Sequence, residues 1–442
     1  MDKQFLEQIF SIKKSWDKSH TEIRFCGLKL KMKKKPKTYT MKDFEKIHSG
    51  YEKLVQTIKE KKDEKIKVAF LVPLASMFSA KALFERMLKN DNFEVSLVVI
   101  PDMRFPQKTQ ENLDKTGQEL IQYKNIMNIV PITEKADRLV LKDIADIVVC
   151  SLPYDVSHEQ YKLENIIKNG MLPVLVNYGF YRSKYDRDLI GNDRCSLYWK
   201  VFTETELNQE EYNNFQKIKG ENTFLSGYSK MDSYKNYKKT TDKTTIMIAP
   251  HHSVKGGFND ALGLSNFYNY AELFLKLPDM YPDISFIFRP HPALFFLLSS
   301  PKYWGQKKVD EYLNRIISKP NVEYSTKGDY FIDFANSDGI IQDCASYLVE
   351  YFYTMKPHCY MLKSEKDIED KFTPLGKQCL ENCYIAYDEK AITDFIDNVI
   401  LKGEDTKKEQ REKFAKEVVM YNYPNVSQTI IDYFERKLKC LK

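Results

Sequence analysis

Residues Ile284–Leu294 read ISFIFRPHPAL, and this stretch indicates both the fold and a site. Its first five residues are almost all apolar without polar alternation, which is typical of a strand buried on both faces. Pro290 and Pro292 prevent a helix from continuing and fix a turn directly after the strand. Arg289 and His291 therefore stand at the carboxyl end of a core strand, where open α/β sheets bind ligands. A guanidinium there can pair with a phosphate, and an imidazole can accept a proton near neutral pH.

Around this stretch, short apolar runs alternate with amphipathic segments along most of the chain. We expect strands at 67–74, 93–101, 128–132, 146–152, 172–178, 199–203, 223–227, 244–249, 284–288, 322–324, 339–342, 358–362 and 383–387. We expect helices at 41–62, 78–90, 107–126, 135–144, 158–169, 209–219, 266–277, 308–317, 330–336, 346–354, 391–401, 407–418 and 426–439. Strands separated by helices predict parallel sheets that carry helices on both faces.

The polar segment Tyr234–Lys243 has no periodicity and is interpreted as a linker between two domains. The predicted fold class is α/β, with two doubly wound Rossmann-like domains, a cleft between them and a small basic N-terminal extension. The extension covers 1–40, an acceptor-side domain 41–236 and a nucleotide-donor domain 244–442. This is the GT-B-like layout of nucleotide-sugar transferases. The chain has neither a G-x-G-x-x-G fingerprint nor a P-loop, which disfavours a dinucleotide oxidoreductase.

Composition narrows the class of protein. The 442 residues are 43% hydrophobic and 29% charged, which is typical of a globular protein. The net charge of +6 does not indicate a nucleic-acid partner. No secretory signal or apolar run of membrane-spanning length is found, so we expect a cytoplasmic protein. The eight cysteines lack the spacing of a zinc site and are expected to be free thiols.

The first 40 residues are expected to hold a short helix and then a basic, strand-like piece at 20–35. Residues 28–37, LKLKMKKKPK, contain six lysines in ten positions. A solvated basic arm explains them, and so does attraction to an anionic membrane surface through the lysines at 30–37. The second interpretation predicts a peripheral protein at the inner face of the plasma membrane.

Residues Gly339–Glu350, GIIQDCASYLVE, form a second candidate site. A strand ends before Asp343, and Cys344, Ala345 and Ser346 make a turn into a helix whose free N–H groups suit a phosphate. The alternative is an ordinary helix cap by Asp343 or Ser346. Glu350 lies one turn into the helix, where it could accept a hydrogen bond from a ribose hydroxyl or form a simple ion pair.

Residues 248–257, IAPHHSVKGG, form a third candidate site, because a strand is followed by His251 and His252. Together with His291, three of the seven histidines fall at strand ends of one domain. We expect no metal, since neighbouring histidines should project in different directions and chelate one ion poorly.

Two loops of the first domain are candidates for acceptor contacts. The strand before Tyr178 and Gly179 leads into a loop with Arg182, Lys184 and Asp186, and Lys230 follows a later strand. Ordinary surface loops are the competing interpretation.

Several of these residues together resemble the CDP-glycerol glycerophosphotransferase family, whose members build teichoic acids and related capsular polymers. The matching residues are Arg289-Pro290-His291-Pro292, Ser337-Asp338, Asp343, Ser346, Glu350 and Lys356-Pro357. Ala249-Pro250, Ser226-Gly227 and Met231-Asp232 also fit the family pattern. The resemblance covers about residues 65–400 and is best in the C-terminal half.

The resemblance implies a CDP-linked donor in the C-terminal domain, with its phosphates at Asp343–Ser346 and Arg289. It also implies a catalytic or phosphate-contacting role for His291. The expected reaction moves glycerol phosphate, or a related polyol phosphate, to a hydroxyl of a glycan or lipid-linked acceptor. His291 or His252 would take the hydroxyl proton, and no obligatory cofactor is expected.

Two alternatives stay open. A glycosyltransferase could use a nucleotide sugar on the same layout. A non-catalytic nucleotide-binding component of a capsule assembly complex is the other, because the family's His-Gly-Thr element reads Asn177-Tyr178-Gly179 here.

Overall fold

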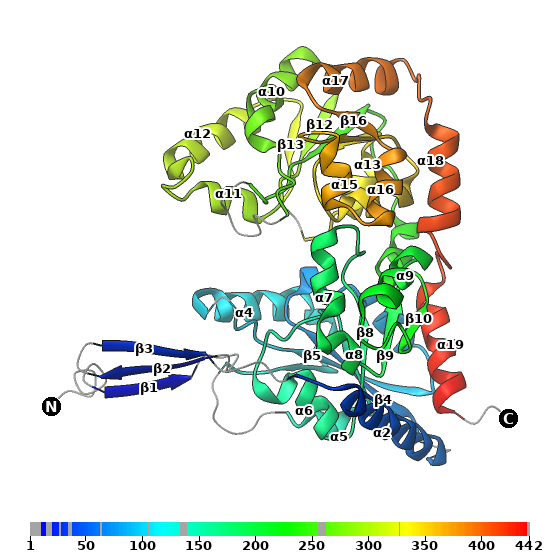
Figure 1. The fold of residues 1–442 in the computed structure, drawn as a ribbon. Helices are drawn as coiled ribbons and strands as arrows, with labels where there is room; N and C mark the ends of the chain where they lie inside the picture. Colours follow the sequence, from blue (N-terminus) through cyan, green and yellow to red (C-terminus); the bar gives the residue numbers. More distant parts are fainter. Residues whose placement is uncertain are drawn as a thin grey trace.

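A computed structural model describes the backbone of residues 10–14, 20–25, 28–33, 38–61, 64–104, 106–132, 139–254, 262–326 and 328–439. Side chains are described from residue 38 onwards. Figure 1 shows two α/β bodies stacked along one direction and a small sheet that projects from the side of the lower body. The two Rossmann-like domains confirm the predicted fold class.

The N-terminal sheet has seven strands in the order β10-β9-β8-β7-β4-β5-β6, and every neighbouring pair is parallel. The strands are β4 (Ile66–Val72), β5 (Phe93–Val99), β6 (Met127–Ile129), β7 (Ile147–Cys150), β8 (Leu172–Val176), β9 (Lys200–Thr203) and β10 (Thr223–Leu225). All seven expected strands of this half are present, most of them shortened by one to three residues at their ends.

The helices that accompany this sheet differ more from the expectation. They are α2 (Met41–Glu60), α3 (Lys81–Met87), α4 (Thr109–Glu119), α5 (Leu141–Ile144), α6 (Leu163–Lys168), α7 (Arg187–Gly191), α8 (Asp193–Leu197) and α9 (Glu206–Phe215). The helix expected at 107–126 ends at Glu119, and residues 133–138 of another lie outside the described residues. Helices α7 and α8 were not expected, because five residues are too few to show a helical period.

The C-terminal sheet has six parallel strands in the order β13-β12-β11-β14-β15-β16. They are β11 (Thr245–Ala249), β12 (Ser285–Phe288), β13 (Val322–Tyr324), β14 (Gly339–Gln342), β15 (His358–Met361) and β16 (Tyr384–Ala386). In β11, Ile246 and Ile248 enter the core on one face, whereas Met247 and Ala249 enter the core on the other. Burial on both faces explains why the inner strands β11, β12, β14 and β15 show no polar alternation, whereas the edge strand β13 exposes Glu323.

The second half of the chain also forms ten described α-helices, of which all but the last accompany this sheet. They are α10 (Phe267–Met280), α11 (Ala293–Leu298), α12 (Gly305–Ile317), α13 (Phe331–Asn336), α14 (Tyr347–Glu350), α15 (Lys366–Lys371), α16 (Pro374–Glu381), α17 (Glu389–Asp394), α18 (Lys408–Phe414) and α19 (Val426–Leu438). We did not expect α11, α15 or α16. Pro292 precedes the first turn of α11, so this proline starts a helix where we expected it only to stop one.

The N-terminal extension is a three-stranded antiparallel sheet of β1 (Phe10–Lys14), β2 (His20–Phe25) and β3 (Leu28–Lys33). The strand-like piece at 20–35 is confirmed as far as Lys33. Phe10–Lys14 forms a strand where a short helix was expected, and residues 34–37 of the lysine-rich stretch lie outside the described residues. Figure 1 shows this sheet extending away from both α/β bodies.

The expected linker is more structured than its polar composition indicated. Tyr234 belongs to a 3₁₀ segment, Ser229–Asn236, and its ring packs edge-on against Phe331 with 5.6 Å between the centroids. The end of the chain then returns to the first domain, because Ile430 and Phe434 of α19 enter the core beneath the N-terminal sheet. Figure 1 shows α18 against the upper body and α19 against the lower one.

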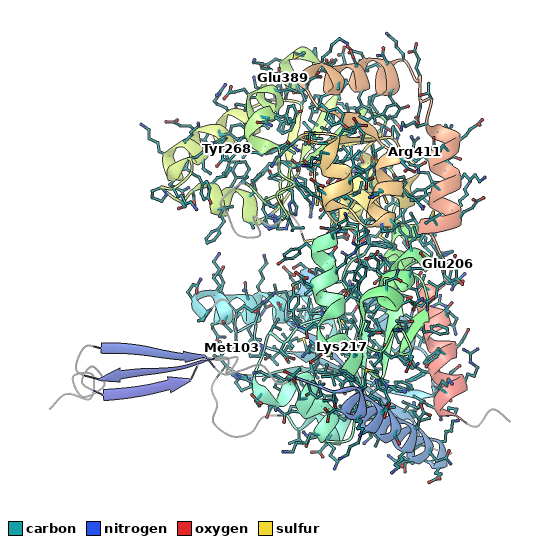
Figure 2. The ribbon with its side chains drawn as sticks, viewed as in Figure 1. Met103, Glu206, Lys217, Tyr268, Glu389 and Arg411 are labelled. Carbon is teal, nitrogen blue, oxygen red and sulfur yellow. The ribbon has the colours of Figure 1, made fainter. Side chains whose placement is uncertain are left out.

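Polar contacts hold both parts of this returning segment. The carboxylate of Asp232 accepts the backbone N–H groups of Val426 and Ser427, at 3.1 and 2.7 Å. Arg411 of α18, labelled in Figure 2, is 1% exposed and donates to the Met355 carbonyl oxygen at 3.0 Å.

Two expectations from composition can also be compared with the structure. The six cysteines at 150, 195, 344, 359, 379 and 383 lie within the described residues, and all are buried free thiols. Among the described helices, none has the length and apolar character that a bilayer crossing requires.

Candidate functional site

The strand order of the C-terminal sheet has a switch point, and doubly wound sheets form a crevice at the carboxyl edge beside such a point. The chain moves from β11 to β12 and β13 on one side, and β14 then pairs with the other side of β11. Loops that leave β11 and β14 therefore diverge, and ligands of doubly wound sheets bind at such a point. His251 and His252 follow β11 by two and three residues, and Asp343 follows β14 directly.

The three histidines converge there. The ring centroids of His252 and His291 lie 4.0 Å apart, those of His251 and His252 lie 4.3 Å apart, and those of His251 and His291 lie 5.3 Å apart. One ring nitrogen of each lies within 4.8 Å of the others. The expectation that the neighbouring histidines diverge is therefore wrong, because the turn after Pro250 folds both rings toward the loop that follows β12.

Burial keeps these imidazoles uncharged. Desolvation lowers the pKa of His252 to about 4, and desolvation followed by the charge of His252 lowers the pKa of His291 to about 3. The pKa of His251 falls well below its usual range through desolvation, and His252, His291 and Arg182 lower it further. All three rings are thus neutral at pH 7, and their nitrogens can accept or donate hydrogen bonds according to tautomer.

Hydrogen bonds also fix the ring positions. The backbone N–H of Ala293 points at Nδ1 of His291 at 3.1 Å, and the backbone N–H of Ser253 points at Nδ1 of His251 at 3.3 Å. The Ser253 hydroxyl lies 2.9 Å from the same Nδ1 and accepts the N–H of Leu264 at 3.0 Å.

Asp343 joins the loops that surround the crevice. Its carboxylate is fully buried and accepts the backbone N–H groups of His251 at 2.6 Å and Asn266 at 2.5 Å. Desolvation raises the pKa of Asp343 to about 7, although both of these hydrogen bonds act in the opposite direction. The residue that we expected near the donor phosphates thus holds the histidine loop against the start of α10.

The rest of the predicted phosphate turn is compact. Cys344 and Ala345 are buried, and Ser346 is half-buried immediately before α14. Burial raises the pKa of the Cys344 thiol to about 11. Because α14 has only four residues before the chain tightens into a 3₁₀ turn, it supplies a weaker N-terminal dipole than the helix expected at 346–354.

Arg289 has protein partners in this structure. Its Nη1 pairs with a carboxylate oxygen of Asp333 at 2.8 Å and donates to the Ser325 hydroxyl at 2.7 Å. Its Nε donates to the Tyr347 hydroxyl at 3.1 Å. Arg289 therefore connects the loop after β12 to α13 and α14, and Asp333 balances its charge.

Glu350 lies where the two halves of the chain meet. It is 1% exposed, and one oxygen accepts the Tyr228 hydroxyl at 3.0 Å and lies 3.5 Å from Nζ of Lys230. The other oxygen accepts the Tyr330 hydroxyl. The expected ribose contact would have to compete with these partners.

The expected acceptor-side residues occupy a junction between domains. The Tyr178 carbonyl oxygen accepts the Tyr228 hydroxyl at 2.7 Å, and a Cβ placed on Gly179 would meet no atom within 4 Å. Lys184 donates to the Glu369 carbonyl oxygen at 2.5 Å. Asp186 is buried and pairs with Arg182 at 3.1 Å.

The sequence placed Arg182 in a loop expected to contact the acceptor and did not predict its approach to the histidines of the second domain. This loop of the first domain is held on the second, because the Arg182 carbonyl oxygen accepts the Thr373 N–H at 3.0 Å. Burial disfavours the charge of Arg182, but Asp186 above all, and also Cys344 and Glu350, raise its pKa. The charge of its guanidinium thus interacts with His251 and with the turn after β14.

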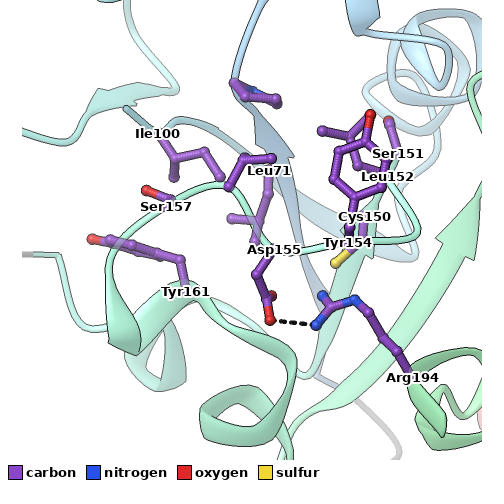
Figure 3. A pocket seen from close by; sticks show the side chains of 12 residues that line it. Leu71, Ile100, Cys150, Ser151, Leu152, Tyr154, Asp155, Ser157, Tyr161 and Arg194 are labelled. Carbon is purple, nitrogen blue, oxygen red and sulfur yellow. Dashed lines mark hydrogen bonds and ion pairs between the residues drawn. The ribbon is translucent and has the colours of Figure 1, made fainter. Parts of the chain in front are cut away.

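A cavity of about 30 Å³ lies at the corresponding edge of the N-terminal sheet. There β4 is followed by β5 and β6 on one side, and β7 pairs on the other. Figure 3 shows the lining side chains, with the carboxylate of Asp155 paired to Arg194 at 2.5 Å. This cavity was not predicted from the sequence, although Ser151, Asp155 and Ser157 follow β7 closely and were a visible signal.

Comparisons with known proteins agree on the fold. No protein-family model matches the chain, and no curated protein does. The wall teichoic acid polymerase TagF superposes with a TM-score of 0.56 at 14% identity, covering 90% of this chain and 94% of TagF. UDP-GlcNAc 2-epimerase from Neisseria meningitidis, bound to UDP-GlcNAc, gives 0.55 at 14% identity, covering 84% and 100%. S. aureus MnaA with UDP gives 0.53 at 16% identity, covering 84% and 97%.

At sequence identities this low, the comparisons show only that the folds are alike. In each comparison the match spans both sheets and nearly the whole of the known structure. The chain therefore has the two-Rossmann-domain GT-B fold.

Proposed function

We propose that this protein is a transferase of cell-surface polysaccharide synthesis that moves glycerol phosphate, or a related polyol phosphate, from a CDP-activated donor to a hydroxyl of a glycan or lipid-linked acceptor. The observation that carries the proposal is the convergence of three neutral histidines at the point where the strand order of the C-terminal sheet reverses. The residues shared with glycerophosphotransferases and the fold shared with TagF support it.

In the proposed reaction, the acceptor hydroxyl attacks the β-phosphorus of the donor, and the bond to the leaving CMP breaks. A neutral imidazole takes the hydroxyl proton, and the surrounding donors stabilise charge on the phosphate oxygens. The nucleotide lies in the C-terminal crevice near Asp343–Ser346. The acceptor enters from the side of Tyr178 and Lys230. Catalysis by positioning and charge stabilisation uses no redox group.

A ligand panel followed by a turnover assay tests the proposal. We expect CMP, CDP or CDP-glycerol to raise the thermal unfolding temperature more than UDP or GDP ligands do. A ligand at 100 times its dissociation constant contributes about 2.7 kcal/mol. Incubation with CDP-glycerol and a glycan acceptor should release CMP. Release of UDP from a nucleotide sugar would instead show a glycosyltransferase, and binding without release would show a nucleotide-binding component.

A further inference from the structure

Two of the three clustered histidines are held by backbone N–H groups. Ala293 N lies 3.1 Å from Nδ1 of His291, and Ser253 N lies 3.3 Å from Nδ1 of His251. A backbone amide nitrogen can only donate, so each Nδ1 must supply the lone pair.

A neutral imidazole carries one proton, and an accepting Nδ1 leaves that proton on Nε2. The Ser253 hydroxyl agrees with this tautomer in His251, because it accepts from Leu264 N at 3.0 Å and can turn its own proton toward Nδ1 at 2.9 Å. Burial keeps both rings neutral. His251 and His291 therefore each present an N–H donor from Nε2.

The tautomer distinguishes three possible roles of the histidine cluster: binding a metal, acting as a general base, and donating hydrogen bonds to an anion. The spacing of the three rings alone would suit a transition metal. A metal-bound imidazole, however, ligates with a lone pair and normally donates its other N–H to a partner, whereas here each Nδ1 receives a donor. A general base at Nε2 would also need a lone pair there. Two N–H groups fit an oxygen that accepts hydrogen bonds.

The positive charge of Arg182 acts on His251, one member of the cluster. It lowers the pKa of His251, and the charges of Cys344 and Glu350 act on the pKa of Arg182. Its buried Nε makes no hydrogen bond within the described residues, while its Nη1 pairs with Asp186. The loop that carries it is fixed on Thr373 of the second domain.

We propose that His251 and His291, each protonated on Nε2, and the guanidinium of Arg182 form an anion site that holds phosphate oxygens. The identity of the anion as the donor's diphosphate rests on the proposed function. His252, whose ring lies 4.0 Å from that of His291, then takes the proton of the acceptor hydroxyl.

Long-range ¹H–¹⁵N spectra of the full chain, labelled on histidine, test the tautomers at pH 7.5. The His251→Asn and His291→Asn variants assign the two rings. We expect Nδ1 of both to show the shift of an unprotonated nitrogen and Nε2 that of a protonated one. Protonation on Nδ1 in either ring overturns the proposal.

Inorganic pyrophosphate binding, measured by calorimetry, tests the site itself. The amide nitrogen of glutamine reaches about as far as Nε2, whereas asparagine stops near Nδ1. We expect His291→Gln to bind pyrophosphate within about 3-fold of the parent, and His291→Asn and Arg182→Gln to bind at least 10-fold more weakly. His48→Gln, in the first domain, is the matched control and should leave the affinity unchanged. Equal losses in the Gln and Asn variants overturn the proposal.

A cobalt titration gives an independent reading. When Co²⁺ is added to the full chain, we expect only the weak visible absorption of the aqueous ion, and an intense stoichiometric tetrahedral spectrum that His291→Asn abolishes would overturn the proposal. These tests do not depend on the donor. A chain with the expected tautomers and pyrophosphate affinity but no turnover of CDP-glycerol would refute only the proposed function.

Discussion

His291 should make the stability of the protein sensitive to mild acid. Its pKa in the folded chain is about 3, well below the ordinary value of 6.5, so between these values the unfolded chain binds the extra proton. Stability contributed by the neutral ring is therefore present above pH 6.5 and is lost as the pH falls toward 3. From pH 7.5 to 5 the loss is about 1 to 2 kcal/mol for this half-buried group.

Urea unfolding of the parent and of His291→Gln at pH 7.5 and 5.0 measures this effect. The variant should lose less stability than the parent over that interval. Asp343, whose raised pKa acts in the opposite direction, is common to both chains and cancels in the comparison. An identical loss in both chains would contradict the depressed pKa.

Asp343 should matter more for stability than its short side chain suggests. Asp343→Asn sets an amide N–H₂ against one of the two backbone N–H donors that the carboxylate now accepts. We expect a loss of about 1 to 3 kcal/mol in the free energy of unfolding, measured by chemical denaturation. Asp310→Asn, at an exposed carboxylate on α12, is the control and should stay within about 0.5 kcal/mol. Equal effects at the two positions would show that the hydrogen bonds accepted by Asp343 contribute little to stability.

At the residue scale, the sequence predicted which polar residues lie at the strand ends but not which side chains contact one another. His251, His291 and Asp343 were expected at strand ends, and the structure places them there. The partner of Arg289, Asp333, is 44 residues away along the chain, and no local pattern announces it. Arg182 reaches the second domain only because its loop is docked on Thr373, which is a tertiary effect.

The small sheet β1–β3 is the element for which a membrane role can be tested. Vesicles of anionic lipid should bind the full chain in a sedimentation assay, and replacing Lys33, Lys34 and Lys35 by Gln should weaken binding. At about 1 kcal/mol for each lysine, the affinity should fall roughly 100-fold. Replacing the exposed Lys307, Lys366 and Lys390 by Gln is the matched control. Equal effects of the two triple variants would refute a local role for the extension.

At the element scale, strands were more predictable than helices. Burial on both faces gave every core strand a short apolar run that stands out from its surroundings. Helix α15 buries none of its residues, so the sequence KDIEDK carries no apolar period to recognise. Helix α11 was missed for the opposite reason, because its start coincides with two prolines that usually end helices.

At the scale of the whole molecule, Asp232 should control how the end of the chain is held. Asp232→Ala leaves the N–H groups of Val426 and Ser427 at the start of α19 without their acceptor. Loss of such a helix cap should lower the thermal unfolding temperature by an amount equivalent to about 0.5 to 2 kcal/mol. Hydrogen exchange should rise in α19 and in the strands it covers. The Asp232→Asn variant, which keeps one acceptor oxygen, should lie between the parent and Asp232→Ala. Unchanged exchange in α19 would contradict this anchoring role.

Gly227 lies close to the backbone of Tyr421, near the place where Asp232 holds the start of α19. Gly227 has φ of +98°, and a Cβ there would lie 2.1 Å from the Tyr421 carbonyl oxygen. Only glycine fits at this place, because the returning segment passes directly over the strand exit after β10.

The returning segment also determines how the two sheets can move. The chain passes between the bodies twice, once near residues 237–244 and once near 420–425, on its way to α19. Two covalent crossings restrict twisting and sliding of one body against the other more than a single linker would. A crosslink or insertion at one crossing would thus change how the two bodies are held together without altering either sheet.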